Sequence, residues 1–235
     1  KTGETLLPFD YLHLGPLSAQ VLLAQKGGRF GLYTVQGQPL SEVQYRVLKG
    51  CDERASYGLC ENLLHNRAIA QYLSEDSFGY LDGYGRAFPP TLPTAEALEA
   101  EYQTVEASRG LMFTFPKGQW QFEPSVSRLY KQGDYGRVRV QYEWIDTGSK
   151  TVQQWLNTTL SGAQTEQLQQ GEIAGREAFF FTEKQRIRYY DFFKKFWYVP
   201  TEEGLLKLEF SCKDDSYLDN AQDLYEIERL LQLKE

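Results

Sequence analysis

Two stretches of the chain share one spacing of aromatic and glycine residues. The first reads GRFGLYTVQGQPL at 28–40, and the second reads SFGYLDGYGRAFPP at 77–90. Three positions match when the two are aligned: Phe30 with Phe78, Gly31 with Gly79, and Gly37 with Gly85. An internal repeat restricts the architecture more than a single motif does, because each copy must form the same supersecondary unit.

Each copy has the pattern of a β-hairpin. An apolar run comes first, AQVLLAQ at 19–25 and AIAQYL at 68–73, and a short turn separates it from the aromatic–glycine strand. A second turn follows at the later glycine, which can adopt the positive φ that tight turns require. We therefore expect residues 1–92 to form a region of β-hairpin repeats.

This spacing resembles the WG-repeat family of bacterial proteins. Pro89 and Pro90 after the second copy match the end of a repeat in that family, and LLPFDY at 6–11 is similar to the tail of a preceding one. Phe30 and Phe78 stand where the family has tryptophan, and the first copy has only Pro39 at its end. The likeness covers residues 6–95 and implies a binding surface, because the family is linked to binding surfaces.

The amino-acid composition changes after the second copy of the repeat. Residues 91–110 read TLPTAEALEAEYQTVEASRG, in which alanine, leucine and glutamate occur at helical density after a capping threonine, Thr94. This composition predicts a helical connector over residues 93–109. We expect a second domain to follow at 110–235.

The segment 110–235 mixes apolar strands with two helical patterns. Strands are expected at 111–116, 120–125, 135–145, 176–182, 186–199 and 205–212. A helix is expected after Ser149 or Thr151, and an amphipathic helix is expected at the C-terminus. The whole chain therefore belongs to the α+β class: hairpin repeats, a helical connector, and an antiparallel sheet with packed helices.

At the level of the fold alone, the C-terminal part resembles the α/β/α sandwich of photosystem extrinsic proteins, envelope lipoproteins and contact-toxin immunity proteins. The run VPTEEGLLKLEFS at 199–211, followed by the terminal helix, carries this likeness. It implies a non-catalytic role in the bacterial envelope.

Net charge and hydropathy restrict the classes of molecule that this protein is expected to bind. The net charge of −7 disfavours nucleic acid and anionic lipid as partners of the whole surface. No apolar run approaches the roughly 20 residues that a membrane span needs. The only methionine is Met112, so the chain starts downstream of its initiator, either because a leader was removed or because the protein was trimmed. We expect a periplasmic or envelope protein, with the cytoplasm as the alternative.

The cysteines allow two interpretations. Cys51 and Cys60 close the short segment CDERASYGLC, so they are either a disulfide that closes a surface loop or two unrelated thiols. The first interpretation suits an oxidising compartment. Cys212, in the strand pattern LKLEFSC, is expected to be a small buried side chain.

Residues for a reaction centre are scarce. His13 and His65 are the two histidines, and neither lies in a nucleophile motif. The sequence has no phosphate-binding glycine motif, and its histidine and cysteine content disfavours a zinc site. We expect no catalytic residues, no metal and no cofactor, and a structure placing either histidine in an open crevice beside a carboxylate and a hydroxyl would overturn this expectation.

The segment KQRIRYYDFFKKFWY at 184–198 interleaves basic and aromatic residues. A half-buried strand explains this pattern, and a protein-binding hot spot is the functional alternative, since tyrosine, tryptophan and arginine are enriched in such sites. Single-stranded nucleic acid is the third interpretation, which the acidic balance disfavours. The candidate protein-binding residues are Arg186, Arg188, Tyr190, Lys194, Lys195 and Trp197.

These observations lead to one functional hypothesis and one alternative. The hypothesis is a protein-binding protein of the bacterial envelope, in its sharpest form an immunity protein that neutralises a secreted toxin. The alternative is an envelope lipoprotein-type carrier or structural domain with a small-ligand groove between sheet and helix. An apolar pocket in the C-terminal domain would favour the alternative.

Overall fold

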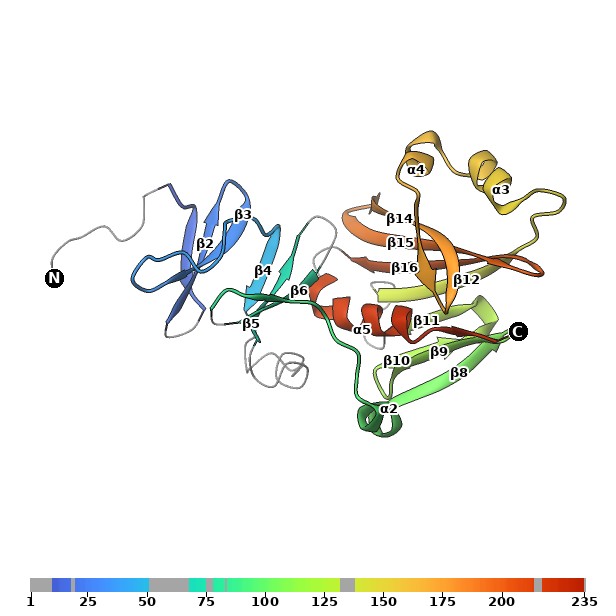
Figure 1. Ribbon diagram of the computed structural model, residues 1–235, viewed down its shortest axis with the longest axis horizontal. Coiled ribbons are helices and arrows are strands. Elements are labelled where there is room, and N and C mark those ends of the chain that lie inside the picture. The colour runs from blue at the N-terminus through green and yellow to red at the C-terminus, as the bar shows by residue number, and fades with distance from the viewer. Residues whose placement is uncertain are drawn as a thin grey trace. The chain divides into compact units, whose positions relative to one another are not determined.

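The structure is a computed structural model, and it confirms the α+β class (Figure 1). It describes residues 10–17, 20–50, 68–74, 78–82, 84–131, 138–213 and 217–234. Contacts within the chain divide it into an N-terminal domain, Lys1–Thr91, and a C-terminal domain, Leu92–Glu235.

The described part of the N-terminal domain consists of short antiparallel strands. They are β1 (His13–Pro16), β2 (Val21–Lys26), β3 (Arg29–Thr34), β4 (Val47–Gly50), β5 (Ala68–Leu73), β6 (Phe78–Asp82) and β7 (Ala87–Phe88). One sheet has the order β1-β2-β3, and the other has the order β4-β5-β6-β7. The two predicted hairpins are therefore β2–β3 and β5–β6.

The two hairpins form repeats with the same strand register. We name residues 10–40 repeat 1 and residues 44–88 repeat 2. In β2–β3, Gln25 pairs with Phe30, and the equivalent pair in β5–β6 is Leu73 with Phe78. The first strand of each repeat also matches, since Leu14 pairs with Ala24 in repeat 1 and Leu48 pairs with Tyr72 in repeat 2. The sequence repeat is thus also a structural repeat.

The same turn closes both repeats. Gly37 has φ 83° and Gly85 has φ 76°, a region that favours glycine. Thr34 and Asp82 occupy equivalent positions before the turn, and each side chain accepts a hydrogen bond from the backbone N–H four residues later, at 3.1 Å and 2.9 Å. A polar side chain therefore caps the turn in each copy.

A seven-stranded antiparallel sheet dominates the C-terminal domain. Its order is β10-β11-β12-β16-β15-β14-β13. The strands are β10 (Trp120–Glu123), β11 (Arg128–Lys131), β12 (Val138–Ile145), β13 (Gln169–Ile173), β14 (Arg176–Ile187), β15 (Tyr190–Thr201) and β16 (Gly204–Lys213). A 3-10 turn, η1 (Pro124–Val126), joins β10 to β11.

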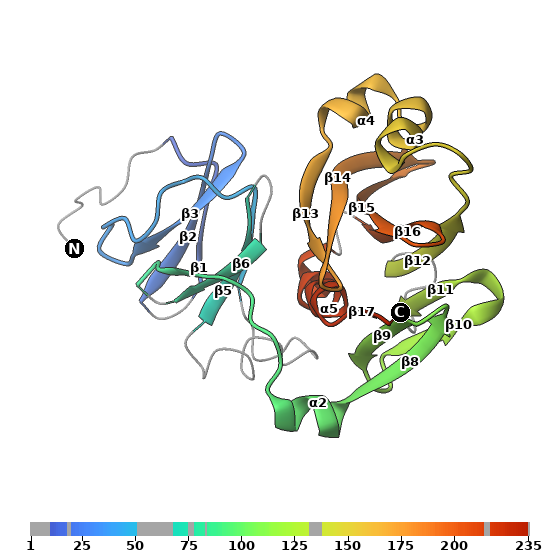
Figure 2. The same cartoon turned by 45° about the vertical axis from the view of Figure 1, so that its right-hand side comes forward.

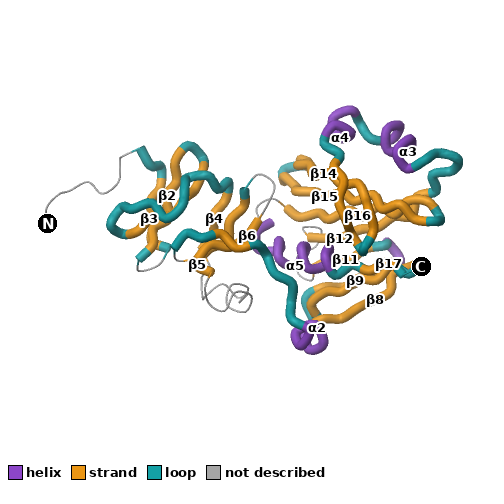
Figure 3. Tube along the Cα trace, viewed as in Figure 1, coloured by secondary structure: helices purple, strands orange, loops and turns teal. Residues whose placement is uncertain are grey.

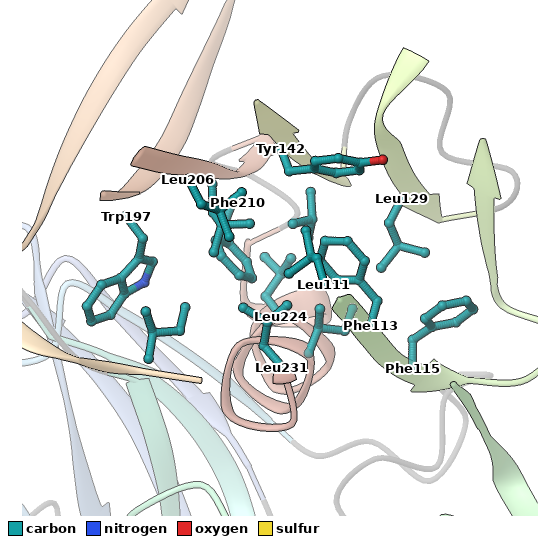
Figure 4. Packing of buried hydrophobic residues seen from close by; sticks show 14 of the residues in the cluster. Leu111, Phe113, Phe115, Leu129, Tyr142, Trp197, Leu206, Phe210, Leu224 and Leu231 are labelled. Atoms are coloured by element: carbon teal, nitrogen blue, oxygen red, sulfur yellow. The ribbon is translucent and has the colours of Figure 1, made fainter. Parts of the chain in front are cut away.

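A second sheet and the terminal helix enclose the core on one side of the large sheet. The smaller sheet has the order β17-β9-β8, with β8 (Tyr102–Ser108), β9 (Leu111–Pro116) and β17 (Gln232–Leu233). Helix α5 (Tyr217–Arg229) lies between the two sheets (Figure 2). Figure 4 shows Leu224 of this helix and Leu231, which follows it, packed near Leu206, Phe210 and Leu111.

The opposite side of the large sheet carries helices α3 (Val152–Thr159) and α4 (Gly162–Glu166), as Figure 3 shows. Thr151 caps α3 through a capping box with Gln154, so one of the two predicted cap residues is confirmed. Leu156 of α3 packs against Phe181 and Tyr198 of the sheet. The large sheet is thus covered on both faces, which explains why its central strands carry apolar residues on both sides.

The prediction of a helical connector over 93–109 was wrong from residue 102 onward. Helix α2 covers only Ala95–Glu101, with Thr94 as its cap, and residues 102–108 form β8 instead. Thr104 and Val105 are β-branched and favour a strand, and β8 pairs with β9 through a hairpin whose turn residue Gly110 has φ 74°. The division between domains accordingly falls at Thr91, before this helix.

Candidate functional site

The segment singled out in the sequence is a long hairpin rather than the single strand expected at 186–199. Strand β14 ends at Ile187, the chain turns at Arg188 and Tyr189, and β15 starts at Tyr190. Arg188 has φ 57°, and neither turn residue is one of the types that usually mark tight turns. This reversal therefore has no local signal in the sequence.

Three of the six candidate residues lie at the end of this hairpin. Arg186, Arg188 and Tyr190 are exposed there, and Tyr190 keeps 52% of its surface accessible. The prediction missed Tyr189, which is 87% exposed, and Ile187, which is 38% exposed. We name residues 186–190 the tip cluster.

The tip cluster extends beyond the neighbouring edge strand. Strand β13 pairs with β14 only as far as the pair Gln169 and Phe180, whereas the β14–β15 pairing continues to Ile187 and Tyr190. The Nζ of Lys213 lies 4.2 Å from the centroid of the Tyr190 ring, and Arg186 Nε is 3.9 Å from Asp191 Oδ1. The tip thus combines cationic groups with exposed aromatic rings.

Lys194 does not belong to this cluster. It is 8% exposed, and its Nζ lies 2.9 Å from Glu209 Oε1, to which Arg139 also approaches at 3.5 Å. These side chains lie on the face of the sheet that carries α3, beside the apolar cluster around Phe196. Lys194 therefore contributes to a cross-strand charge network within the sheet.

Lys195 and Trp197 lie on the other face, toward α5. The Nζ of Lys195 is 2.7 Å from Glu228 Oε1 and 4.9 Å from the centroid of the Trp197 ring. Trp197 is only 3% exposed and packs in the main core against Phe180, with ring centroids 4.6 Å apart. The Trp197 ring is thus part of the core. Of the predicted protein-binding surface, only the tip cluster remains exposed.

A polar cluster around α5 was not identified from the sequence. Lys131 Nζ lies 2.8 Å from Asp223 Oδ2 and 2.9 Å from Asn220 Oδ1, and Trp120 Nε1 donates to Asp223 Oδ2 at 3.1 Å. All of these residues are buried. The partners are far apart in the sequence, so only the observation that α5 carries polar residues on several sides could have suggested it.

Glu226 extends this polar cluster by one helical turn. It is 2% exposed and accepts hydrogen bonds from Tyr102 Oη at 2.5 Å and from Gln222 Nε2 at 2.7 Å. Burial raises the pKa of Glu226 above its usual value, and the nearby Asp223 acts in the same direction, while the two hydrogen bonds oppose them. Burial and the bond to Glu226 also raise the pKa of Tyr102. All of these residues except the half-buried Tyr102 are buried, and their contacts join α5 to both sheets.

The remaining candidates from the sequence are placed as follows. Cys51, Cys60 and His65 lie outside the described residues. Cys212 is a fully buried side chain in β16, as predicted. His13 lies on β1 and is exposed.

Within the described ranges, no three histidine, cysteine or acidic side chains gather as a metal site would require. No helix in those ranges combines the length and apolarity that a bilayer crossing demands.

No protein-family model matches this chain, and no curated protein matches it. A crystal structure from Bacteroides thetaiotaomicron aligns with a TM-score of 0.31 and 10% identity, over 58% of this chain and 43% of that one. This chain thus spans less than half of that protein.

LpqN of Mycobacterium tuberculosis, described as involved in cell envelope biogenesis, aligns with a TM-score of 0.32 and 12% identity. The alignment covers 63% of this chain and 84% of LpqN. Scores this low carry no inference about the fold or the function of the present protein.

Proposed function

We propose that this chain is a non-catalytic protein-binding protein and that the tip cluster contacts its partner. The observation that carries the proposal is the exposure of Tyr189 and Tyr190, at 87% and 52%, directly after the exposed arginines Arg186 and Arg188. Tyrosine and arginine are enriched among residues that dominate binding energy at protein interfaces. A tyrosine ring also provides a large contact area at a low cost in side-chain entropy.

The chemistry of the tip indicates the kind of partner surface. Arg186 and Arg188 suit carboxylates, which arginine binds through paired hydrogen bonds. Tyr189 and Ile187 suit an apolar depression. The partner is therefore expected to present acidic groups around an apolar surface, even though this chain as a whole has a net charge of −7.

The biological setting that we propose is the bacterial envelope, and the sharpest form of the proposal is an immunity protein that neutralises a secreted toxin. The support for this form is the fold-level resemblance of the C-terminal sequence. An immunity protein must bind quickly and tightly, and charged groups at an exposed tip speed association.

The alternative of a small-ligand carrier receives no support from the described residues. A carrier would need an apolar groove between α5 and the large sheet. Side chains fill this interface in the structure, including Leu224 from the helix and Trp197 and Phe210 from the sheet (Figure 4).

Binding to the product of the adjacent gene, measured by isothermal titration calorimetry, tests the proposal. Tyr189→Ala is expected to weaken binding by at least about tenfold, as at other interface hot spots. Tyr84→Ala is the matched control, because Tyr84 is 73% exposed in the N-terminal domain and also lies beside an arginine. Equal affinities for the two variants would contradict the assignment of the tip.

A charge-reversed variant separates the tip from a general electrostatic effect. Arg186→Glu combined with Arg188→Glu is expected to slow association and to reduce its dependence on salt. If the double variant associates at the wild-type rate, the arginines of the tip have no role in recognition.

A further inference from the structure

Equivalent residues of the two N-terminal repeats have different surroundings. Leu14 in repeat 1 and Leu48 in repeat 2 occupy the same register position on the first strand of their repeat. Leu48 is 5% exposed, whereas Leu14 is 46% exposed, and its neighbour Leu12 is 75% exposed. An apolar position that is buried in one repeat is thus open in the other.

Repeat 1 covers Leu48. The buried cluster that contains Leu48 also includes Val21 and Leu32 of repeat 1. The backbones of the two repeats join at the bridge between Phe30 and Tyr45: Phe30 N–H donates to the Tyr45 carbonyl at 2.8 Å, and Tyr45 N–H donates to the Phe30 carbonyl at 3.1 Å. The aromatic–glycine strand of repeat 1 is therefore hydrogen-bonded to repeat 2 at Tyr45, just before β4 begins.

Tyr11 in repeat 1 corresponds to Tyr45 in repeat 2. The next residue shows this equivalence, because Leu12 N–H donates to the Gln25 carbonyl at 2.7 Å and Arg46 N–H donates to the Leu73 carbonyl at 2.8 Å. The backbone of Tyr11 and the face formed by Leu12 and Leu14 thus have the position through which repeat 2 binds its predecessor.

The sequence at the start of the chain continues the repeat pattern backward. Residues 3–11 read GETLLPFDY and align with residues 37–45, GQPLSEVQY. Three positions are identical: Gly3 with Gly37, Leu6 with Leu40, and Tyr11 with Tyr45. The segment before Tyr11 has the sequence of the end of a repeat, from its turn glycine onward.

We propose that the backbone of Tyr11 and the face formed by Leu12 and Leu14 bind a third β-hairpin repeat, formed by residues that precede Lys1 in the natural protein. An aromatic–glycine pair is expected upstream of Tyr11 at the same separation that Phe30 has from Tyr45. The occupant of this face is a strand that bonds to the backbone of Tyr11 and covers Leu14, as β3 does for repeat 2. This proposal is independent of the function assigned to the tip cluster.

Site-resolved hydrogen exchange tests the proposal by comparing the chain that starts at Lys1 with the natural polypeptide that includes the upstream residues. The amide of Tyr11 is expected to exchange at least about tenfold more slowly in the longer protein, because a hydrogen-bonded strand protects it. The amide of Tyr45 serves as the internal reference, and its exchange rate is expected to be the same in both proteins.

Two outcomes would overturn the proposal. One is an upstream sequence without the aromatic–glycine pair, or equal exchange of the Tyr11 amide in both proteins. The other is protection of Tyr11 that depends on protein concentration, which would show that a second copy covers the face.

A pair of variants checks the side-chain contact. Leu14→Asn is expected to lower the melting temperature of the longer protein and to leave that of the shorter chain unchanged. Leu48→Asn is expected to lower the melting temperature of both. A Leu14→Asn variant with an unchanged melting temperature in the longer protein would exclude burial of this residue.

Discussion

Lys131 and Asp223 form a buried ion pair that joins the large sheet to the terminal helix, with Nζ 2.8 Å from Oδ2 and side chains that are 9% and 5% exposed. Asn220 and Trp120 supply additional hydrogen bonds to the pair. A buried ion pair is tolerated when such partners satisfy it, but removal of one member leaves an uncompensated charge.

Lys131→Met is therefore expected to destabilise the C-terminal domain by about 3–5 kcal/mol, because the buried Asp223 loses its cationic partner. Lys207→Met is the control, since Lys207 faces Glu143 at 3.8 Å on a more exposed surface and should change stability by about 0–1 kcal/mol. Urea unfolding of both variants measures the difference. Similar decreases in the free energy of unfolding of the two variants would show that the buried ion pair contributes no more to stability than the exposed one.

Glu226 should make stability depend on pH. Its pKa in the folded protein is raised above the usual value, so the folded state holds a proton more tightly than the unfolded chain does. The fold is thus favoured at low pH relative to high pH, and this contribution is lost as pH rises through the raised pKa.

Glu226→Gln removes this titration. The free energy of unfolding of the wild-type protein, relative to that of Glu226→Gln, is expected to increase as pH falls toward the ordinary glutamate range. Urea unfolding at several pH values measures this difference. A difference that stays constant with pH would contradict the raised pKa.

Gly110 should tolerate alanine less well than Gly118 does. Both glycines have positive φ, at 74° and 73°, so each substitution carries backbone strain of roughly 1–2 kcal/mol. A Cβ at Gly110 would lie 2.2 Å from the carbonyl oxygen of Lys234, whereas a Cβ at Gly118 meets nothing within 4 Å. Gly110→Ala should therefore lower the free energy of unfolding, measured in urea, more than Gly118→Ala does. Equal decreases would show that the backbone near Lys234 shifts to accommodate the added Cβ.

The two turn caps should differ in strength. The Asp82 carboxylate accepts from the backbone N–H of Tyr84 at 2.8 Å and of Arg86 at 2.9 Å, whereas Thr34 Oγ1 accepts at 3.3 Å and 3.1 Å in the equivalent turn. Hydrogen bonds to charged groups are stronger than those to neutral ones. Asp82→Ala should therefore lower the free energy of unfolding by about 2–3 kcal/mol, and Thr34→Ala should lower it by about 1 kcal/mol. Thermal unfolding of the N-terminal domain within the whole chain compares them, and the reverse order would refute the argument.

The elements that were predicted well from the sequence are those with local signals. The aromatic–glycine spacing specified both N-terminal hairpins, and Thr151 with Gln154 marked the start of α3. Residues 102–108 were assigned to a helix because they follow a helical composition, although their pairing with β9 makes them a strand. Pairing with a neighbouring strand is a tertiary effect that local composition does not record.

The candidate site was only partly predictable for a similar reason. Adjacent strand residues point to opposite faces, so Lys194 and Lys195 could never share one surface, and this follows from the sequence once the strand is known. The turn at Arg188 had no such signal. The burial of Trp197 depends on α5, and the partners of Lys131 lie 89 and 92 residues away along the chain.

The connection between the first two strands differs greatly in length between the repeats. Pro16 and Leu22 are paired across five intervening residues, whereas Gly50 and Ala70 are paired across nineteen, yet the strand register is the same. Closing the longer segment adds only about 1 kcal/mol of chain entropy. An insertion at this point is therefore expected to leave the pairing of the two strands unchanged.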